Sequence, residues 1–540
     1  MGAIPVHALA KGPNEASRGE ILYNGIRLPA DWPPRDHAVT REPMGVPYLA
    51  SPPDVIPIDI GRQLFVDDFL IEKTTLRRTF HAAEYIPDNP ALKPDKPWET
   101  EGRDPCAMVF SDGVWYDPTD RLFKMWYMGR YCLSTCYTTS RDGTHWEKPS
   151  LDVRPGTNIV HTARRDSGTV WLDLQEKDPN RRYKLFIYQL PEKPGALAIY
   201  FSPDGIHWGD VVARSGPCGD RTTVFYNPFR KVWVYSIRDY TPETGRTRRY
   251  REHEDVLAGA RWEAGEPTPW TGADRLDPRR PELNVPPELY NLDAVAYESL
   301  LLGLFSIWPG QPSDRPKPNY VALGFSRDGF HWDRPCRRPL IPVSERRGDW
   351  NWGNVQSAGG GCLIVGDRLY FYVSGRAGLE GSSASGVCST GLATLRRDGF
   401  ASMDAGPCGG TLTTRPVRFK GKYLFVNAAA SRGQLTAEIT DEAGNVIPPF
   451  SQANCIPVRG DTTLQAVRWT GASDLSKLAD LSRVKFRFHL RNAQLYSFWV
   501  SASRSGASRG YVAAGGPGFT GPTDTVGEAA YRKASALRSK

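Results

Sequence analysis

Stretches rich in apolar, aromatic and β-branched residues recur along the chain, each followed by a cluster of polar turn residues. Such stretches predict β-strands rather than helices. The clearest are RLFKMWYMG (121–129), RYKLFIYQL (182–190), KVWVYSIRD (231–239), YESLLLGLFSIW (297–308) and RLYFYVSGR (368–376). In VKFRFHL (484–490), apolar and polar residues alternate, which predicts a strand with one buried and one wet face.

A short turn motif divides the chain into repeats. The pattern S-x-D-G-x-H-W occurs at 140–146, 202–208 and 326–332, and a degenerate copy, RRDGF, occupies 396–400. Its aspartates are separated by 62, 124 and 70 residues, so one unit is hidden near 266, where ARWEAGEP holds Trp262. Five units of about 60 to 70 residues are typical of a propeller or another repeat architecture.

Each repeat predicts one small antiparallel sheet, because Asp-Gly between two extended runs is a strong hairpin signal. Five four-stranded sheets around an axis make a five-bladed β-propeller, so we expect an all-β protein. The alternative is a β-sandwich with inserted repeats. The predicted organisation is an extended, proline-rich arm (1–55), a propeller (56–405), a β-sandwich (406–505) and a mobile or draped tail (506–540). RQLFVDDFLIE (62–72) is a candidate for the strand that closes the ring.

Composition narrows the function classes. The 540 residues carry a formal charge of +8, but the basic residues are scattered and the densest run is RTRRYR (246–251), which argues against nucleic-acid binding. Nine cysteines without paired spacing argue against a disulfide framework or a zinc site. No stretch of 18 apolar residues predicts a membrane span. The N-terminus lacks signal-peptide features, which favours a cytoplasmic location, with a secreted mature form as the alternative.

The turn motif itself contains a carboxylate and an imidazole, Asp142 and His145, which could serve as a general acid/base pair. Its recurrence favours another role, because a unique active site does not need several copies. We expect the motif to form an outer hairpin and to pack Trp146 between blades.

Candidate chemistry lies at the starts of the innermost strands, which converge on the central funnel of a propeller. About 35 to 40 residues before the turns stand Asp104, Asp166, Asp220 and Glu288, which we take as the candidate catalytic residues. Each aspartate could instead be a turn or cap residue. Paired carboxylates, one ionised and one protonated, are typical of glycosidic bond cleavage. The candidate substrate-binding residues are Arg103, Arg165, Arg221, Trp98, Tyr290, Asn291, Asp293, Trp352, Asn354 and Gln356.

The five repeats, the carboxylates at blade starts, the N-P-A-L stretch (Asn89 to Leu92) and the trailing sandwich resemble the propeller glycoside hydrolases of families 32, 43 and 68. The layout is most similar to family 32, over roughly residues 60–505. The resemblance implies Asp104 as nucleophile or base, Asp166 as transition-state stabiliser and Asp220 as acid. The family-32 motif W-x-N-D-P-N-G is absent, and Arg103-Asp104-Pro105 echoes the R-D-P motif on a different blade, so Glu288 is an alternative acid.

The sequence therefore predicts a glycoside hydrolase or transglycosidase, exo-acting on a furanoside such as a fructoside or arabinofuranoside. The alternatives are a non-catalytic carbohydrate-binding propeller and a lyase or phosphorylase on the same scaffold. The expected partner is a carbohydrate, with no nucleic acid and no membrane, and a homo-oligomer stays open. No cofactor and no metal are required, although carboxylates and backbone oxygens would suit a calcium ion.

Overall fold

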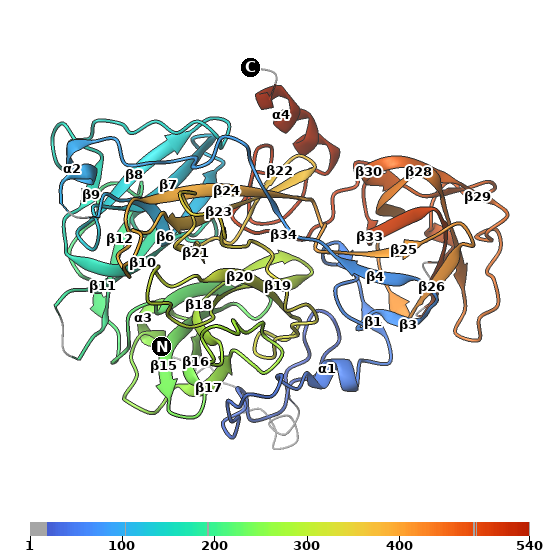
Figure 1. Cartoon of the computed structure of the whole chain (residues 1–540). Helices are drawn as coiled ribbons and strands as arrows, with labels where there is room; N and C mark the ends of the chain where they lie inside the picture. Colours follow the sequence, from blue (N-terminus) through green and yellow to red (C-terminus); the bar gives the residue numbers. More distant parts are fainter. Residues whose placement is uncertain (1–18, 103, 192–193, 479–480, 482, 539–540) are drawn as a thin grey trace, which may run out of the picture.

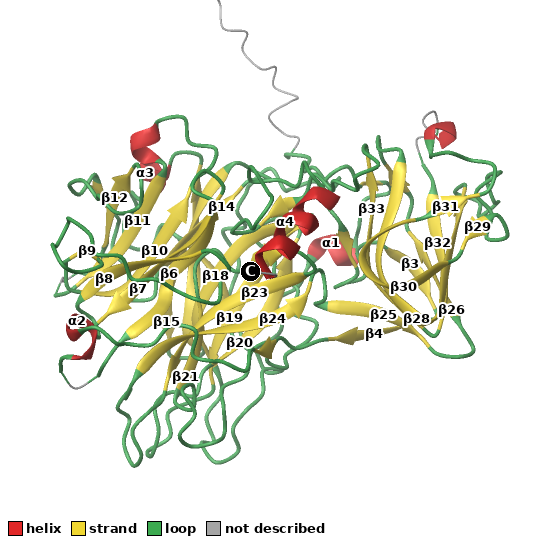
Figure 2. Ribbon diagram, turned by 90° about the horizontal axis from the view of Figure 1, so that it is seen from above, coloured by secondary structure: helices red, strands yellow, loops and turns green. Residues whose placement is uncertain are grey.

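The computed structural model describes residues 19–538 except 103, 192–193, 479–480 and 482. Strand pairing confirms the predicted all-β class. Five sheets are arranged as the blades of a propeller, and a sandwich-like β-domain lies beside them (Figures 1 and 2). The innermost strands β6, β10, β14, β18 and β21 contact one another in a closed ring, which defines the funnel axis.

The first three blades contain four strands each, which follow in chain order from the axis outward. Blade 1 is β6 (Ala107–Asp117), β7 (Leu122–Gly129), β8 (Ser134–Ser140) and β9 (Ile159–His161). Blade 2 is β10 (Arg165–Leu172), β11 (Tyr183–Gln189), β12 (Leu197–Ser202) and β13 (Ala213–Arg214). Blade 3 is β14 (Thr223–Asn227), β15 (Val232–Thr241), β16 (Gly245–His253) and β17 (Thr268–Gly272). The third blade contains the repeat that carries no turn motif.

Blades 4 and 5 borrow strands from distant parts of the chain. Blade 4 is β18 (Glu288–Glu298), β19 (Leu300–Trp308) and β20 (Tyr320–Ser326), with β34 (Tyr511–Val512) of the tail paired to β18. Blade 5 is β21 (Asn354–Ser357), β22 (Leu363–Val365), β23 (Arg368–Arg376) and β24 (Cys388–Arg396), with β5 (Glu84–Tyr85) paired to β24. Strand β5 therefore closes the ring, and the segment at 62–72 does not.

The segment at 62–72 belongs to the sandwich by strand pairing. Most of its apolar side chains are buried in the sandwich core, whereas Leu64 and Val66 pack into the propeller core. Strand β2 (Gln63–Leu64) pairs with β33, and Phe65 packs on Phe498 with ring centroids 5.6 Å apart. Asp67 forms a buried ion pair with Arg327 at 2.7 Å. The predicted propeller boundaries therefore differ from the strand pairing, which places residues 56–80 with the sandwich.

The main sheet of the sandwich-like domain runs in the order β3-β26-β32-β28-β33-β25-β4, and β2 and β30 pair at its side. Its further strands are β3 (Ile71–Thr74), β4 (Arg77–Phe80), β25 (Ala401–Ala405), β26 (Gly410–Thr414), β28 (Tyr423–Thr440), β30 (Val458–Ala466), β32 (Lys485–Arg491) and β33 (Ala493–Ser501). Two small sheets pair β1 (Ile56–Pro57) with β27 (Val417–Arg418) and β29 (Cys455–Ile456) with β31 (Arg468–Trp469). Strand β32 buries Phe486, Phe488 and Leu490 on alternate positions, as its pattern predicts.

Short helices lie at the edges of both domains. They are α1 (Pro47–Ala50), α2 (Pro97–Thr100), α3 (Val256–Gly259), the 3-10 turns Pro179–Arg181 and Ser476–Leu478, and α4 (Glu528–Arg538) near the C-terminus. The tail crosses the far end of the funnel axis, where Ala514 O accepts a hydrogen bond from Tyr116 N at 2.9 Å and Gly515 O accepts one from Ile364 N at 2.9 Å. The tail is thus draped over the propeller, and it covers the end of the axis opposite the inner strand starts.

The turn motif joins neighbouring blades. In the first copy, Asp142 Oδ1 accepts hydrogen bonds from the backbone N–H groups of Thr144 (2.7 Å) and His145 (2.9 Å), and Asp142 Oδ2 lies 2.7 Å from His145 Nδ1. The copies at Asp204 and Asp328 repeat this geometry. The histidine thus bonds its own turn, as expected for a structural motif.

The aromatic contacts of the motif cross from blade to blade. Trp126 of blade 1 donates its indole N–H to Gly205 O of blade 2 at 2.6 Å. Trp270 of blade 3 does the same to Phe330 O of blade 4 at 2.7 Å. Trp146 packs edge-on against Tyr372 of blade 5, with ring centroids 5.5 Å apart. These contacts support the predicted packing role of the motif.

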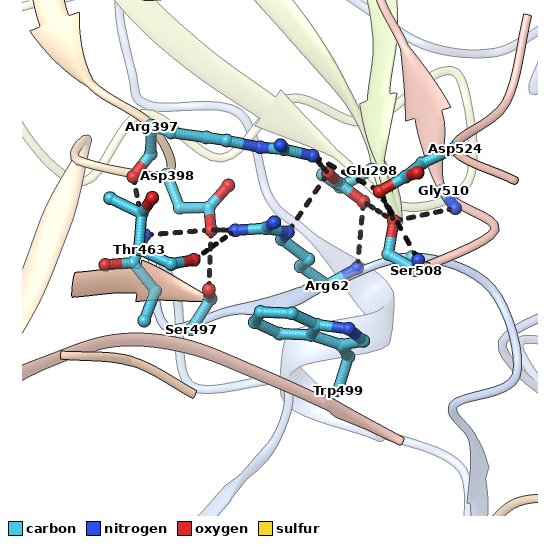
Figure 3. Close-up of polar contacts among 12 residues, drawn as sticks. Arg62, Glu298, Arg397, Asp398, Thr463, Ser497, Trp499, Ser508, Gly510 and Asp524 are labelled. Atoms are coloured by element: carbon cyan, nitrogen blue, oxygen red, sulfur yellow. Dashed lines mark hydrogen bonds and ion pairs between the residues drawn. The ribbon is translucent and has the colours of Figure 1, made fainter. Parts of the chain in front are cut away.

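The degenerate copy of the turn motif, in blade 5, is part of a buried charge cluster between propeller, sandwich and tail (Figure 3). Its members are fully buried and come from four parts of the chain: Arg62, Glu298, Arg397, Asp398 and Asp524. Ion pairs join Arg62 to Asp398 (3.0 Å) and Glu298 (3.4 Å), and Arg397 to Glu298 (3.0 Å) and Asp524 (3.5 Å). The Arg62 guanidinium also lies 4.1 Å from the ring centroid of Trp499 on β33. We name these five charged residues the joint cluster.

Candidate active site

The inner strands bulge near the level at which their candidate residues stand. The pairing register shifts between Met108 and Gly113 in β6, between Arg165 and Gly168 in β10, and between Leu289 and Asn291 in β18. Bulges re-aim side chains and are frequent next to active sites. They turn Phe110, Asp166 and Tyr290 out of the ordinary strand alternation.

Two residues at this level have strained backbones. Phe110 has φ 47° and Arg221 has φ 62°, a region that non-glycine residues rarely occupy. The Arg221 guanidinium is fully buried and lies 3.7 Å from the ring centroid of Phe110. Its backbone N–H donates to Ser167 Oγ at 2.8 Å, which ties blade 3 to blade 2. Strain of this kind concentrates at functional sites.

The structure brings two of the predicted catalytic carboxylates together. Burial, and then repulsion by Asp220, raise the pKa of Asp166 against the attraction of Arg221 and Arg376. Asp166 Oδ1 is buried and has no hydrogen-bond partner among the described residues. Asp220 is ion-paired with Arg238 of β15. The two carboxylates thus occupy different environments: Asp166 Oδ1 has no described hydrogen-bond partner, whereas Asp220 is held by a cation.

Asp104 and Glu288 stand apart from this pair. Asp104 Oδ1 is buried without a partner among the described residues, and the Asp104 charge acts on the thiol of Cys388, at the start of β24. Glu288 Oε2 accepts a hydrogen bond from the backbone N–H of Arg246 at 2.9 Å. Within the described part of the chain, no interaction links either carboxylate directly to Asp166 or Asp220.

Below the carboxylates lies a network of hydrogen bonds that joins the inner strands. Asp293 Oδ2 accepts hydrogen bonds from Asn291 Nδ2 (2.7 Å) and Ser357 Oγ (2.6 Å), and burial raises the Asp293 pKa against the pull of Arg221. Arg248 donates to the carbonyl oxygens of Arg221 (2.6 Å) and Tyr290 (2.7 Å). Asn291 and Asp293 thus help to position the inner strands, and substrate contact by either of them stays a prediction.

The other predicted binding residues on blades 4 and 5 surround the mouth. Arg246 lies over Tyr290 at 4.6 Å, and Arg315 lies over Trp352 at 4.8 Å. Asn354 donates to Lys317 O at 2.6 Å and accepts from Gln356 Nε2 at 2.8 Å. Gln356 Oε1 is buried and has no partner among the described residues. Tyr290 and Gln356 are the members of this set that remain candidates for substrate contact.

Two predicted binding residues have local partners away from the funnel mouth, and a third lies outside the described residues. Trp98 is in α2, where its indole N–H donates to Asn158 at 2.9 Å beside the outer strands of blade 1. Arg165 is fully buried and forms a two-pronged ion pair with Asp112. Arg103 lies outside the described residues. Local packing engages both side chains, and substrate contact by Trp98 or Arg165 stays a prediction.

Sequence reasoning missed the residues contributed by second strands. Arg238 lies on β15 two residues beyond Ser236, which pairs with Thr223 at the start of the inner strand β14. Arg376 ends β23, opposite Asn354 at the start of the inner strand β21. An antiparallel second strand ends beside the start of the inner strand, so its last residues also face the mouth. The polarity of the strands was the signal that could have identified both arginines.

Neither a metal-binding group of side chains nor a membrane-spanning helix is found among the described residues. In the parts of the chain that the structure describes, no three His, Cys, Asp or Glu side chains are grouped so that they could hold a metal ion. A calcium ion in the funnel stays a prediction. All nine cysteines are free, and no described helix is long and apolar enough to cross a membrane.

No family model matches the chain, and the curated proteins contain no match. Among solved structures, the chain is similar to a thermostable family-43 glycoside hydrolase, with 12% identity and a TM-score of 0.37 over 54% of this chain and 92% of that one. It is similar to an exo-β-1,3-galactanase from Phanerochaete chrysosporium, with 10% identity and a TM-score of 0.32 over 78% and 99%. It is also similar to an endo-1,4-β-xylanase from Bacteroides thetaiotaomicron, with 11% identity and a TM-score of 0.35 over 53% and 90%.

Family 43, which the name of the first of these structures gives, is one of the families that the sequence resembles. Similarity at this level says nothing of activity. Function therefore has to be inferred from the side chains at the funnel mouth.

Proposed function

We propose that the protein cleaves glycosidic bonds at the mouth of the propeller funnel. One observation carries the proposal: Asp166 and Asp220 lie on adjacent blades in opposite electrostatic environments. Asp220 is ion-paired with Arg238, whereas Asp166 has no ion pair among the described residues and a raised pKa. A buried carboxyl with a raised pKa, next to a carboxylate that is ion-paired with an arginine, can supply one acid and one base.

In this proposal, Asp166 is the general acid. Its proton passes to the glycosidic oxygen while the bond from that oxygen to the anomeric carbon breaks. Asp220 stays ionised and faces the positive charge that develops on the sugar, as base toward water or as nucleophile. This differs from the roles implied by the family resemblance, in which Asp166 stabilises the transition state and Asp220 or Glu288 is the acid.

The substrate is a carbohydrate, and we keep a furanoside as the proposed sugar class because of the resemblance to families 32, 43 and 68. The mouth offers aromatic surface for a sugar ring at Tyr290 and Trp308, whose rings lie edge to face with centroids 6.2 Å apart. Tail residues cover the opposite end of the axis, so the substrate enters from the side where the inner strands start.

A panel of substrates tests the proposal. Wild type and the double variant Asp166→Asn/Asp220→Asn are incubated with fructans, aryl arabinofuranosides, xylosides and galactosides, and released sugar or phenol is measured. We expect turnover of at least one member by wild type and a loss of about 10²-fold or more in the double variant. Asp210→Asn is the matched control, because Asp210 is an exposed aspartate of blade 2.

Failure of wild type to turn over any member, while it still binds one of them, would support the non-catalytic carbohydrate-binding alternative. Equal turnover by wild type and the double variant would place the chemistry elsewhere.

A further inference from the structure

The arginines at the funnel differ from the other buried arginines of the chain. Nine arginine side chains are buried among the described residues. Six of them form an ion pair with a carboxylate: Arg62, Arg165, Arg315, Arg327, Arg334 and Arg397. The other three form none with any described residue, and all three lie at the funnel: Arg221, Arg248 and Arg376.

Buried cations without an ion pair are costly, so a pattern confined to one place needs an explanation. Asp293, Asp166 and Asp220 attract the Arg221 cation, but none of them forms an ion pair with it. Arg248 donates to two carbonyl oxygens, its Nε has no partner among the described residues, and burial, followed by the charge of Arg221, lowers its pKa to about 9. Arg221 lacks more hydrogen-bond partners than Arg248 does. All three of its guanidinium nitrogens are buried and have no hydrogen-bond partner among the described residues. Buried donors in native proteins are nearly always paired, which indicates that a ligand group completes this site.

The donors of these cations are free because aromatic rings support their faces. Arg221 and Arg376 both lie over Phe110, at 3.7 and 5.8 Å from the ring centroid. Arg376 donates only to Ser385 Oγ, at 3.2 Å, and its Nε has no partner among the described residues. A guanidinium held by its face keeps its N–H edge available for a planar anion.

A second pair of cations continues this arrangement toward the rim. Arg246 and Lys317 lie over Tyr290, at 4.6 and 5.7 Å, and over Trp308, at 5.4 and 5.9 Å. Neither forms an ion pair with a described residue, and Arg246 Nη1 is buried without a partner among them. Arg248 donates to the carbonyl oxygens of both Arg221 (2.6 Å) and Tyr290 (2.7 Å), so the two pairs of cations border one site.

We propose that the glycoside bound at this mouth carries an anionic group, either a uronate carboxylate or a sulfate ester, held by Arg221, Arg246 and Lys317. This inference rests on the proposed function only in so far as the mouth binds a sugar. Tyr290 and Trp308 contact the sugar ring, while the guanidinium edges take the oxygens of the anion. A neutral sugar leaves these donors unpaired and binds less tightly.

Calorimetric titration of the full chain tests this without depending on catalysis. The probes are D-glucuronate, D-galacturonate and galactose 6-sulfate, each compared with neutral glucose and galactose. We expect the matching acidic sugar to bind about tenfold or more tightly than its neutral counterpart, and added salt to reduce the difference. Comparison of the uronates with the sulfate ester distinguishes the two sources of negative charge.

Arg246→Met is the informative variant, because Arg246 is only partly buried and its removal leaves the deep floor intact. We expect it to abolish most of the preference for the acidic sugar. Arg251→Met is the matched control on the same strand, where Arg251 instead pairs with Glu266 at 3.5 Å. It should leave the preference unchanged.

Equal affinity for acidic and neutral sugars, no binding of any acidic probe, or an unchanged preference in Arg246→Met would overturn the inference. Such a result together with turnover of neutral glycosides would leave the proposed function standing. Tight binding of an acidic sugar without cleavage of any glycoside would uphold the inference and contradict the proposed function.

Discussion

Asp166→Asn is expected to lose about 10³-fold in kcat/KM on glycosides with poor leaving groups and to keep most of its rate on activated aryl glycosides. A general acid contributes 10²- to 10⁴-fold when the leaving oxygen needs a proton. A dinitrophenolate leaves without one, so the loss should shrink as the pKa of the leaving phenol falls. A series of aryl glycosides assayed with wild type and variant measures this dependence.

The same series separates the two assignments of the acid. If the resemblance to the propeller glycosidases assigns the roles correctly, Asp220→Asn or Glu288→Gln shows the dependence on leaving group, and Asp166→Asn loses rate equally on all members. Asp210→Asn, the exposed control, should match wild type throughout. A uniform loss in Asp166→Asn would therefore rule out its role as proton donor while keeping it in the site.

Arg62→Met is expected to lower the free energy of unfolding by about 3–5 kcal/mol, because it strands buried carboxylates. Arg62 is fully buried, it bonds Asp398 and Thr463 O, and it lies over Trp499 (Figure 3). The joint cluster connects the propeller, the sandwich and the tail, so the variant should also unfold in two separated steps. Urea unfolding followed by tryptophan fluorescence measures both effects.

Acid should remove the stability that Asp398 contributes to the joint cluster. Although burial opposes it, the charges of Arg62 and Arg397 hold the pKa of Asp398 at about 2. A carboxyl with a depressed folded pKa stabilises above its unfolded pKa, and this contribution is lost as the pH falls from about 4 toward 2. In Arg62→Met, the pKa of Asp398 in the folded state should rise toward or above its unfolded value, so less stability should be lost over this pH range.

Arg483→Met is the matched control for the joint cluster. Arg483 forms an exposed ion pair with Glu442 at 3.0 Å in the sandwich, and such pairs contribute about 0–1 kcal/mol. If Arg62→Met and Arg483→Met were equally stable, the joint cluster would not hold the domains together.

The propeller was predictable because its repeat is local. Each Asp-Gly turn is held by hydrogen bonds between its own residues, such as those between His145 and Asp142. The number of blades can therefore be derived from the spacing of the turns. The same repeat spacing predicted that Asp166 and Asp220 stand at the starts of adjacent inner strands. The pairing of residues 62–80 with the sandwich was not predictable. Its partners, such as Phe498, lie hundreds of residues away, and no local sequence pattern identifies them.

The candidate site was predictable only where it follows the repeat. Arg376 stands at the end of a second strand, and its place at the mouth depends on its antiparallel register with Asn354. Trp98 looked like a sugar platform, but α2 packs it beside Asn158 on the outer strands. Phe110 owes its position to a bulge in β6, which changes the alternation that a sequence pattern assumes.

A double-mutant cycle tests the central claim most directly. The value of kcat/KM on one unactivated glycoside is measured for wild type, Asp166→Asn, Asp220→Asn and the double variant. Residues that act as a unit are non-additive, so we expect the double variant to be hardly slower than the slower single variant. Losses that multiply, or single variants with the wild-type rate, would contradict the claim that Asp166 and Asp220 cleave the glycosidic bond together.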